Sequence, residues 1–403
     1  MQAEAIFFNR DYDPEAIARD ARVGDALRRE NLHVASFIDH VYYSAKEILK
    51  DDGSPYVVFT PFKHRWLQRH EQDPRPPIAS LAAVKNKLAA TNTIGTTLSV
   101  PAPEHYGLRR STLYPRGGSA NAGELLDAFI EERIDAFADK RNFPALEATS
   151  RLSPYLRAGS VGIRTCVHAA SEARRRTRPI HRIGVDTWLS GLIVRDFFQA
   201  VLANFPRVAN EPFLEEAKDL RFPSSEEAFN AWREGRTGYP IVDAAMTQLN
   251  TYGWMHNRLR MIAASFLSKH LLLDYRLGER YFEQRLVDAE LASNNGGWQG
   301  CASMGSDAAP NFRVFNPVIQ SEKVDPDGTF IKKMLPALAG LDAKAIHAPW
   351  TLTPTQAQAA GLRLGREYPE PIVDHLQARD RATVFYAALR KGTVRSADNP
   401  VFP

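Results

Sequence analysis

The sequence has little cysteine and none of the short motifs that mark the common enzyme classes. Among its 403 residues only Cys166 and Cys301 are cysteines, and they lie far apart, which excludes a disulfide framework and a zinc site of the usual spacing. The motifs GxGxxG, Walker, GxSxG, HExxH and CxxC are also missing, so the usual nucleotide-binding, hydrolase and metalloprotease functions lack local support. We expect a reducing compartment and no metal site.

The chain also lacks a strong charge bias and a long apolar run. Its 51 basic and 47 acidic residues give a net charge of +4, which is too small to indicate a polyanionic partner. The most apolar helix-like run, MIAASFLSKHLLL, is interrupted by Lys269 and His270, and the N-terminus has no signal-peptide pattern. We therefore expect a folded cytoplasmic protein that does not enter a membrane.

Apolar patterning divides the chain into an α/β part and a helical part. Apolar runs at 6–8 and 33–38 flank an N-cap and proline at Asp13-Pro14, which predicts one β-α-β unit within residues 1–60. The sheet looks incomplete, because two parallel strands cannot bury both faces. Residues 61–123 are rich in Pro, Gly, Ser and Thr and predict a linker, and residues 124–403 predict an all-α domain. The expected fold class is α/β plus all-α.

Helix starts in the second part are marked by local capping signals. Ser153 and Thr353 each precede a proline, and Ser224 with Glu227 has the spacing of a capping box. These signals predict helices that begin near 153, 225 and 354.

Two segments carry polar groups that suit a ligand. In TSRLSPYLRAG, hydroxyls at Thr149, Ser150 and Ser153 lie at a predicted helix N-terminus, which suits a phosphate, although an ordinary helix cap is the alternative. In GWMHNRLRM, helical spacing puts Asn257 and Arg260 on one face, with a solvated face as the alternative.

A third segment, RLVDAELASNNGGWQ, combines charged and amide groups with small residues. The carboxylates of Asp288 and Glu290 can hold an arginine or a ring N–H, and the amide of Asn294 can donate to or accept from a heteroaromatic edge. The Gly-Gly pair before Trp298 lets a planar ligand approach the backbone closely. These residue types suit a planar ligand beside polar groups of both signs.

The chain resembles the photolyase and cryptochrome family of flavoproteins, and most closely the bacterial DNA photolyases. The resemblance covers nearly the whole chain and rests on VFTPFKHRWL, TSRLSPYLRAG, WLSGLIVRDFF, TGYPIVDAAMTQLNTYGWMHNRLRM, RLVDAELASNNGGWQ and DAAPNFRVFNP. It implies an N-terminal α/β domain, a linker and a helical domain that holds FAD in a folded, U-shaped conformation. Asn294 agrees with this, because an amide can follow the flavin N5 through changes of protonation.

The resemblance also implies roles for individual residues. The diphosphate would lie on the TSRLSP segment, Arg260 and Asp288 would pair beside the isoalloxazine, and Glu290 replaces a second aspartate near the ribose and flavin. The implied FAD contacts are Thr149, Ser150, Leu152, Ser153, Trp188, Asn257, Arg260, Asp288, Glu290 and Asn294. The candidate catalytic residues are Asn294 and Trp298 and, for an oxidoreductase with a new substrate, Arg258 as the anchor of an anionic group and His256 as an acid/base candidate, with a structural role as the alternative for His256.

The expected substrate pocket departs from the family, in which flipped pyrimidine dimers stack on tryptophans and receive an electron from light-excited reduced flavin. Gly191 replaces a glutamate that contacts the damaged bases, and Val194 and Gly300 replace the two stacking tryptophans. Stacking on an aromatic ring is worth roughly 1–3 kcal/mol per base, so these changes predict weak dimer binding. Arg258 and Met261 complete the expected pocket.

The expected electron relay and DNA contacts are changed in part. The inner relay tryptophan is Trp298, but Tyr275 and Phe222 replace the other two, which predicts slow photoreduction by the family's usual route. Phosphate contacts are expected from arginines that match those of photolyases, aided by the basic run at 173–178, for which a solvated helix end is the alternative. These arginines are Arg141, Arg195, Arg258 and Arg313.

The N-terminal part is shorter than the family pattern, because the usual opening strand is missing. We therefore expect that a second antenna chromophore is absent, and the open sheet edge could pair with another chain, although the sequence leaves the oligomeric state open. A truncated reading frame is the alternative explanation.

Three functions fit these observations. The first hypothesis is a divergent flavin-dependent oxidoreductase, in which Gly191, Val194 and Gly300 open the pocket for an unidentified small-molecule substrate. The second is a light-dependent photolyase that repairs cyclobutane pyrimidine dimers in damaged DNA. The third is a cryptochrome-like light sensor or DNA-binding flavoprotein. We favour the first, because the clamp and the relay are both altered.

Overall fold

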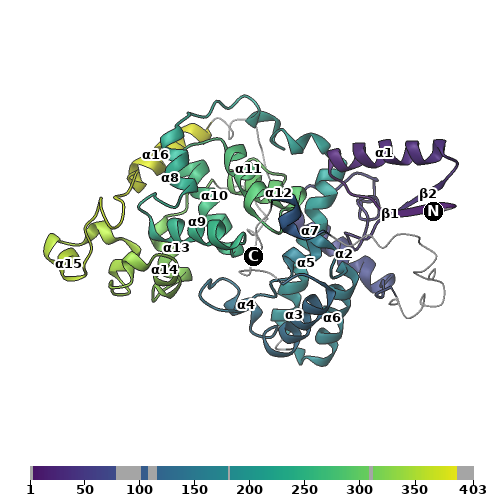
Figure 1. The fold of residues 1–403 in the computed structure, drawn as a ribbon, viewed down its shortest axis with the longest axis horizontal. Coiled ribbons are helices and arrows are strands. Elements are labelled where there is room, and N and C mark those ends of the chain that lie inside the picture. Colours follow the sequence, from purple (N-terminus) through teal and green to yellow (C-terminus); the bar gives the residue numbers. More distant parts are fainter. Residues whose placement is uncertain (1–2, 79–100, 108–115, 180–181, 308–311, 388–403) are drawn as a thin grey trace.

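The N-terminal part is a small α/β unit. The computed structural model describes residues 3–78, 101–107, 116–179, 182–307 and 312–387. The unit consists of β1 Ala5–Asn9, α1 Pro14–Arg29 and β2 His33–Phe37, and it projects from one end of the helical body (Figure 1). The two strands pair in parallel, as the sequence predicts, and they form the one sheet of the described residues.

Local signals explain this unit. The carboxylate of Asp13 accepts a hydrogen bond from the backbone N–H of Glu15 at 2.8 Å, and Pro14 occupies the first turn, so the predicted cap is confirmed. One face of the sheet is open, because the rings of Phe7 and Phe37 remain 64% and 55% exposed. Pairing of this sheet with another copy stays a prediction.

The rest of the described chain is mainly helical. Its α-helices are α2 Phe59–Gln72, α3 Ser119–Glu132, α4 Phe137–Lys140, α5 Ser153–Ala158, α6 Ile163–Arg176, α7 Arg182–Asn204, α8 Glu226–Arg233, α9 Pro240–Tyr252, α10 Asn257–Ser265, α11 Tyr275–Arg285, α12 Leu291–Cys301, α13 Pro317–Val324, α14 Thr329–Met334, α15 Pro354–Ala359 and α16 His375–Tyr386. A π-helical turn, Phe266–His270, extends α10. This agrees with the predicted fold class of α/β plus all-α.

Helix α2 occupies the beginning of the stretch that the sequence predicts as a linker, residues 61–123. It buries Phe59, Phe62 and Trp66 and packs against α7, so this part is helical rather than irregular. Residues 79–100 and 108–115 of the predicted linker lie outside the described residues.

The predicted helix starts are partly confirmed. Thr353 caps α15 in a capping box with Gln356, as its Thr-Pro pair suggests. The predicted box at Ser224 is wrong by one residue, because Ser225 is the N-cap of α8 and accepts from the N–H of Ala228 at 3.1 Å. Adjacent serines offer the same cap chemistry, and the backbone geometry selects between them.

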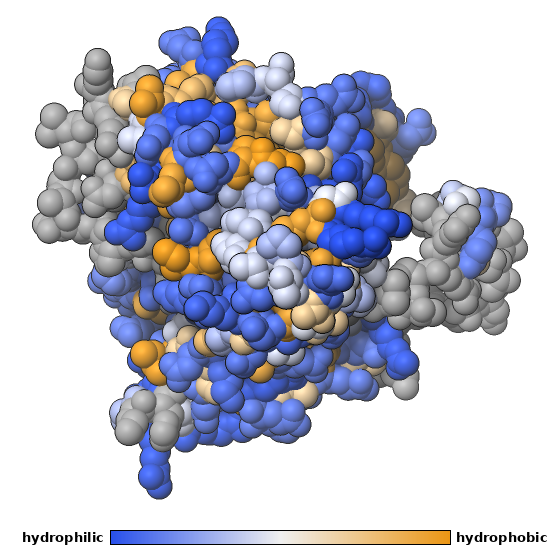
Figure 2. All heavy atoms as spheres, turned by 90° about the vertical axis from the view of Figure 1, so that its left-hand side faces the viewer, coloured by the Kyte–Doolittle hydropathy of each residue, from blue (hydrophilic) through white to orange (hydrophobic). Residues whose placement is uncertain are grey.

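Two hydrophobic cores build the helical body. One surrounds α7 and includes Phe129, Trp188 and Phe197, and the other surrounds α9 and α10 and includes Trp232 and Trp298. A cavity lies between the two cores. On the face shown in Figure 2, apolar patches lie among hydrophilic residues, as is usual for protein surfaces.

Candidate flavin pocket

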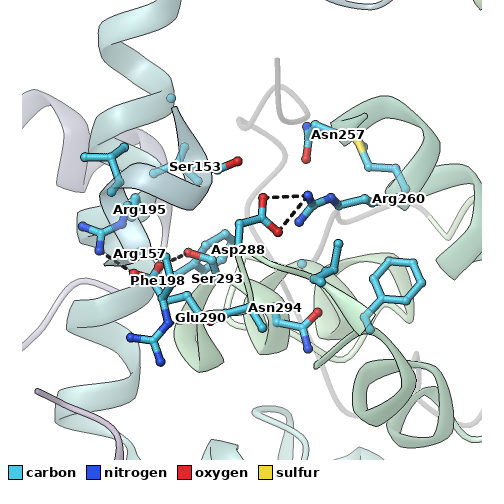
Figure 3. Close-up of a pocket in the computed structure, with 18 of the residues that line it drawn as sticks. Ser153, Arg157, Arg195, Phe198, Asn257, Arg260, Asp288, Glu290, Ser293 and Asn294 are labelled. Atoms are coloured by element: carbon cyan, nitrogen blue, oxygen red, sulfur yellow. Dashed lines mark hydrogen bonds and ion pairs between the residues drawn. The ribbon is translucent and has the colours of Figure 1, made fainter. Parts of the chain in front are cut away.

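A cavity of about 360 Å³ lies between α5, α7, α10, α11 and α12. Its position between the two hydrophobic cores gives it apolar walls, and the ends and connections of these helices supply polar groups (Figure 3). The residues that line it are Ser150, Leu152, Ser153, Leu156, Arg157, Trp188, Gly191, Leu192, Val194, Arg195, Phe198, Asn257, Arg260, Met261, Ala264, Phe282, Leu286, Asp288, Ala289, Glu290, Ser293, Asn294, Gly297, Trp298 and Cys301.

An ion pair between Arg260 and Asp288 lies at the edge of this cavity (Figure 3). One terminal nitrogen of Arg260 donates to both oxygens of Asp288, at 3.0 and 2.8 Å, and its Nε donates to the carbonyl of Met255 at 2.8 Å. The Asp288 side chain is only 2% exposed. The predicted pairing is therefore present, and a charge-assisted bond in a buried place holds both groups in fixed orientation.

A second ion pair, between Arg195 and Glu290, also lies at the cavity (Figure 3). Ser293 Oγ donates to the other oxygen of Glu290 at 2.5 Å, and Arg195 also donates to the backbone carbonyl of His40. The side chains of Arg195 and Glu290 are 12% and 11% exposed. In this arrangement the guanidinium of Arg195 is mostly enclosed and paired, and its predicted contact with a DNA phosphate stays a prediction.

Asn294 and Trp298 lie one turn apart on α12, with both side chains at the cavity. The amide nitrogen of Asn294 donates to the backbone carbonyl of Glu279 at 3.0 Å, which leaves its carbonyl oxygen as the polar atom available to a ligand. Trp298 is buried against Gly278, where an added Cβ would lie 2.1 Å from the indole. Gly278 is thus a site residue that sequence reasoning missed, because only the packing reveals the contact.

Most other predicted FAD contacts also line the cavity. Ser150, Leu152, Ser153, Trp188 and Asn257 do so. Thr149, which was predicted with them, is not a lining residue.

Arg157 lines the cavity together with Ser150 and Ser153, and the sequence analysis did not include it among the site residues. Its Nε donates to the carbonyl of Ala289 at 2.5 Å, which joins α5 to the chain before α12. The arginine stands within the quoted TSRLSPYLRAG segment, and its charge near three hydroxyls was the signal that could have identified it.

The described chain matches known proteins over most of its length. Residues 188–388 match the family described as FAD binding domain of DNA photolyase, and residues 1–82 match DNA photolyase. Deoxyribodipyrimidine photo-lyase of Salmonella typhimurium is 40% identical over 390 residues, which covers 96% of this chain and 79% of the relative. The protein belongs to the photolyase and cryptochrome family.

Other members of the family agree in sequence and in fold. Deoxyribodipyrimidine photo-lyase of Escherichia coli is 39% identical, with 96% of this chain and 79% of the relative covered. A bacterial class III photolyase from Agrobacterium tumefaciens has a TM-score of 0.84 at 35% identity, covering 96% of this chain and 80% of that one. Synechocystis cryptochrome has a TM-score of 0.83 at 27% identity, covering 95% and 79%. The prediction of family and FAD is confirmed.

Two predicted catalytic residues of this photolyase-family chain lie outside the cavity. His256 caps α10, where its Nδ1 accepts from the N–H of Arg258 at 3.2 Å, and burial lowers the His256 pKa to about 4. The guanidinium of Arg258 donates to Asn142 Oδ1 at 2.9 and 3.2 Å. His256 is therefore a neutral structural cap, the alternative that the sequence left open, and the role of Arg258 as a substrate anchor stays a prediction.

The expected substrate end of the cavity is lined by small or flexible side chains. Gly191, Val194 and Met261 line it, whereas Gly300 does not and its neighbour Cys301 does. A Cβ added at Gly191 or Gly300 would meet no atom within 4 Å, so both positions border open space. Cys301 was missed because a lone cysteine gives no signal in sequence; burial raises its pKa to about 11.

Two arginines remain as candidate phosphate contacts. Arg313 is exposed, and its backbone carbonyl accepts from Lys269 Nζ at 2.8 Å. Arg141 is half-buried, and burial together with nearby Arg258 lowers its pKa. Exposure favours Arg313 as the more accessible contact. Among the helices described, none is both long and apolar enough to cross a membrane.

We expect a pH-dependent stability from Glu279, which lies behind Asn294. Burial raises the pKa of Glu279 to about 7, against a smaller opposite effect of its hydrogen bond from Asn295. Since the folded pKa lies above the unfolded one, the folded state holds the proton more tightly. Binding of this proton therefore contributes to the free energy of unfolding. The contribution is fully present below the unfolded pKa, near 4.5, and is lost as pH rises through about 7.

The variant Glu279→Gln keeps the size of the side chain and removes its titration. Wild type should lose on the order of 3 kcal/mol of unfolding free energy relative to this variant between pH 5 and pH 8. Urea unfolding at the two pH values measures the difference. An equal change in unfolding free energy between pH 5 and pH 8 in wild type and variant would show that Glu279 does not titrate with a raised pKa.

Proposed function

We propose that the protein is a light-dependent DNA photolyase that uses FAD to repair cyclobutane pyrimidine dimers. The main support is the cavity with the Arg260–Asp288 pair and Asn294, in a chain 40% identical to a protein named deoxyribodipyrimidine photo-lyase. FAD would supply the light-excited electron that splits the dimer. This reverses our preference for a divergent oxidoreductase, because the relatives are named as photolyases and no comparison favours another substrate.

The residues of the cavity suit the parts of FAD. Hydroxyls of Ser150 and Ser153 and the guanidinium of Arg157 line one end and suit the diphosphate. The carboxylate and guanidinium of the Asp288–Arg260 pair can meet the donors and acceptors of the isoalloxazine edge, and the free oxygen of Asn294 can accept from N5. Apolar walls exclude water from the ring system. We therefore assign the cofactor to this cavity.

The test is blue-light repair of a dimer-containing oligonucleotide by FAD-loaded protein whose flavin was chemically reduced beforehand. Prior reduction removes any dependence on the altered relay. We expect dimer loss under light and none in the dark. No repair by protein that holds stoichiometric FAD would contradict the proposed function.

One observation favours a second candidate, a flavin-dependent oxidoreductase with a non-dimer substrate. The substrate end of the cavity carries Gly191 and Val194, and no aromatic platform stands at either position. Such a space suits a small molecule beside the flavin. Flavin reduction or oxygen consumption in darkness on a metabolite panel would support this candidate, and inertness across the panel would count against it.

Restoring the two missing rings should strengthen dimer binding. The double variant Val194→Trp and Gly300→Trp offers two stacking surfaces, and an added Cβ at position 300 would meet no atom within 4 Å. Stacking contributes roughly 1–3 kcal/mol per base, so the dissociation constant should fall about tenfold or more. Fluorescence anisotropy on dimer-containing and undamaged oligonucleotides measures this. Equal affinity of wild type and variant for the dimer would mean that these positions do not face it.

A further inference from the structure

Two histidines from distant parts of the chain share a hydrogen bond. His270 is the last residue of the π-helical turn and His375 is the first residue of α16, and Nε2 of His270 lies 2.9 Å from Nδ1 of His375. The two rings stack at 5.2 Å between centroids, and Phe266 also stacks on His270 at 4.9 Å. A hydrogen bond between two imidazoles needs one nitrogen with a proton and one without. The contact therefore depends on the protonation of both rings.

The surroundings of His270 favour its neutral form. The residue is 1% exposed, and its Nδ1 has no hydrogen-bond partner among the described residues. Burial, together with the nearby His375 and Lys269, lowers the pKa of His270 to about 3. The ring of Tyr239 lies 6.4 Å away and stays uncharged, because burial raises the pKa of Tyr239 to about 12. At neutral or mildly acidic pH a proton therefore reaches His270 only when its contact with α16 opens.

His375 is the more accessible member of the pair. It is half-buried, and burial and Arg379 lower its pKa, while Asp374 acts in the opposite direction. Close to it, the hydroxyl of Tyr239 donates to the carbonyl of Val373 at 2.8 Å. The beginning of α16 is thus attached to the helical body by the histidine pair and by this one neutral hydrogen bond.

The other end of α16 is attached to the same π-helical turn and to the segment that carries Arg313. The hydroxyl of Tyr386 donates to the carbonyl of Ser268 at 3.1 Å, and its ring stacks on Phe312 at 4.9 Å between centroids. Lys269 Nζ, which donates to the carbonyl of Arg313, lies 5.0 Å from the centroid of the Phe312 ring. Helix α16 and the turn therefore hold the backbone of the exposed candidate phosphate contact, Arg313.

We propose that His270 and His375 form a proton-sensitive latch that holds α16 and, through Tyr386, the Phe312–Arg313 segment in place. The value of this segment for DNA binding rests on the proposed function. While both rings are neutral, their shared hydrogen bond closes the latch. A proton on each ring would place two N–H donors opposite each other beside the charge of Lys269, so the latch opens. Acid therefore loosens the helix that supports Arg313.

The direction of the pH dependence follows from the two states of the latch. In the open state both rings reach water and titrate near their ordinary pKa of about 6.5, whereas the closed state keeps His270 neutral. The latch has its full strength above this ordinary pKa and loses strength as pH falls below it. Between pH 7.5 and pH 5.5 the opening constant should rise about tenfold for each histidine that stays neutral in the closed state.

The test is hydrogen–deuterium exchange of the FAD-loaded protein at pH 7.5 and pH 5.5, measured by mass spectrometry on peptides from α16 and corrected for intrinsic exchange rates. In wild type the opening constant of α16 should rise about tenfold to a hundredfold towards the lower pH. Peptides from α3 serve as the internal reference and should show no such rise. Exchange reports the opening of the latch without any need for DNA or light.

Two variants and a matched control assign the effect to the pair. His270→Gln offers an amide N–H to His375 and does not titrate, so the rise in its opening constant should be about tenfold smaller than in wild type. His375→Asn keeps an acceptor oxygen for His270, and it should also reduce the rise. The control His168→Gln removes a half-exposed histidine of α6 and should behave as wild type.

Coupling to the Phe312–Arg313 segment has its own readout. Thermolysin cuts before large apolar residues, and cleavage before Phe312 requires its ring to leave Tyr386. Because cleavage of a transiently open state follows the opening equilibrium, this rate, normalised to that of an unstructured peptide, should rise between the two pH values by the same factor as the opening of α16. In His270→Gln the rise should be smaller by the same factor as in exchange.

An opening constant of α16 that is equal at both pH values in wild type would overturn the proposal. So would a rise in His270→Gln as large as that in wild type. If the buried variant does not fold, the half-buried His375→Asn decides, and a rise equal to that of wild type contradicts the latch. Failure of the proposed function gives a separate result, since it appears as absent dimer repair by protein whose flavin was reduced chemically.

Discussion

The variant Asp288→Ala should lose most of its FAD. The carboxylate of Asp288 is almost fully enclosed and accepts two bonds from Arg260, so its removal leaves a guanidinium unpaired at the cavity edge. Breaking one partner of a buried ion pair costs about 3–5 kcal/mol. If this cost falls on the FAD-bound state, affinity should drop by about two orders of magnitude or more.

FAD content after purification and a fluorescence titration of the apoprotein measure this effect. The matched control is Glu234→Ala, which breaks an ion pair with Arg236 at 2.5 Å on the exposed surface. That variant should hold FAD as wild type does, because exposed pairs contribute little. FAD affinity of Asp288→Ala within a few-fold of the control would show that the cofactor does not depend on this pair.

The second large effect is expected at Asp196, which joins the segment after β2 to the helical body. Its buried carboxylate on α7 accepts from the N–H groups of Tyr42 and Tyr43, at 3.1–3.4 Å, and from Trp66 Nε1 at 3.0 Å. The variant Asp196→Ala leaves these three buried N–H donors without a hydrogen-bond acceptor. Each buried donor without an acceptor costs about 1–3 kcal/mol, so we expect a loss of about 3–5 kcal/mol in unfolding free energy.

Urea unfolding at pH 8 tests this, since burial raises the Asp196 pKa to about 6 and the carboxylate is ionised at the higher pH. The control is Asp186→Ala on the same helix, where an exposed carboxylate meets Arg174 at 2.7 Å. It should lose less than about 1 kcal/mol. Equal losses in the two variants would mean that Asp196 does not hold the two parts together.

The sequence was most informative where one local pattern determines the outcome. Asp13 and Thr353 cap their helices because a side-chain oxygen and a following proline act within a single turn. Arg260 and Asp288 were paired correctly through family resemblance, and their 28-residue separation offers no local signal for the contact. The fold class was predicted from apolar patterns over long segments, in which a misjudged position of one residue has little effect.

Internal partners of charged side chains were not predicted where they come from distant parts of the chain. Arg195 was assigned to DNA, but Glu290, the longer acid in the aspartate position, pairs with it. Arg258 was assigned to a substrate, but Asn142 lies within hydrogen-bond distance. In both cases a charged residue found an internal partner more than 90 residues away. Residue type and spacing within a motif carry no information about such partners.

The two ends of the cavity differ in how closely they agree with the family. The cofactor end retains paired charges and an amide in defined orientations, and it agrees with the family. The expected substrate end is lined by the small side chains of Gly191 and Val194. Function therefore depends on whether that space still accepts a dimer. The light-repair assay and the restored-ring variant address this point separately from cofactor binding.

The most direct measurement of the central claim is a crystal structure of the protein with FAD. We expect FAD to lie in the cavity between α7 and α12, with its isoalloxazine beside Asn294 and the Arg260–Asp288 pair and its diphosphate at Ser150 and Ser153. Electron density for FAD outside this cavity, or with the flavin ring away from Asn294, would contradict it.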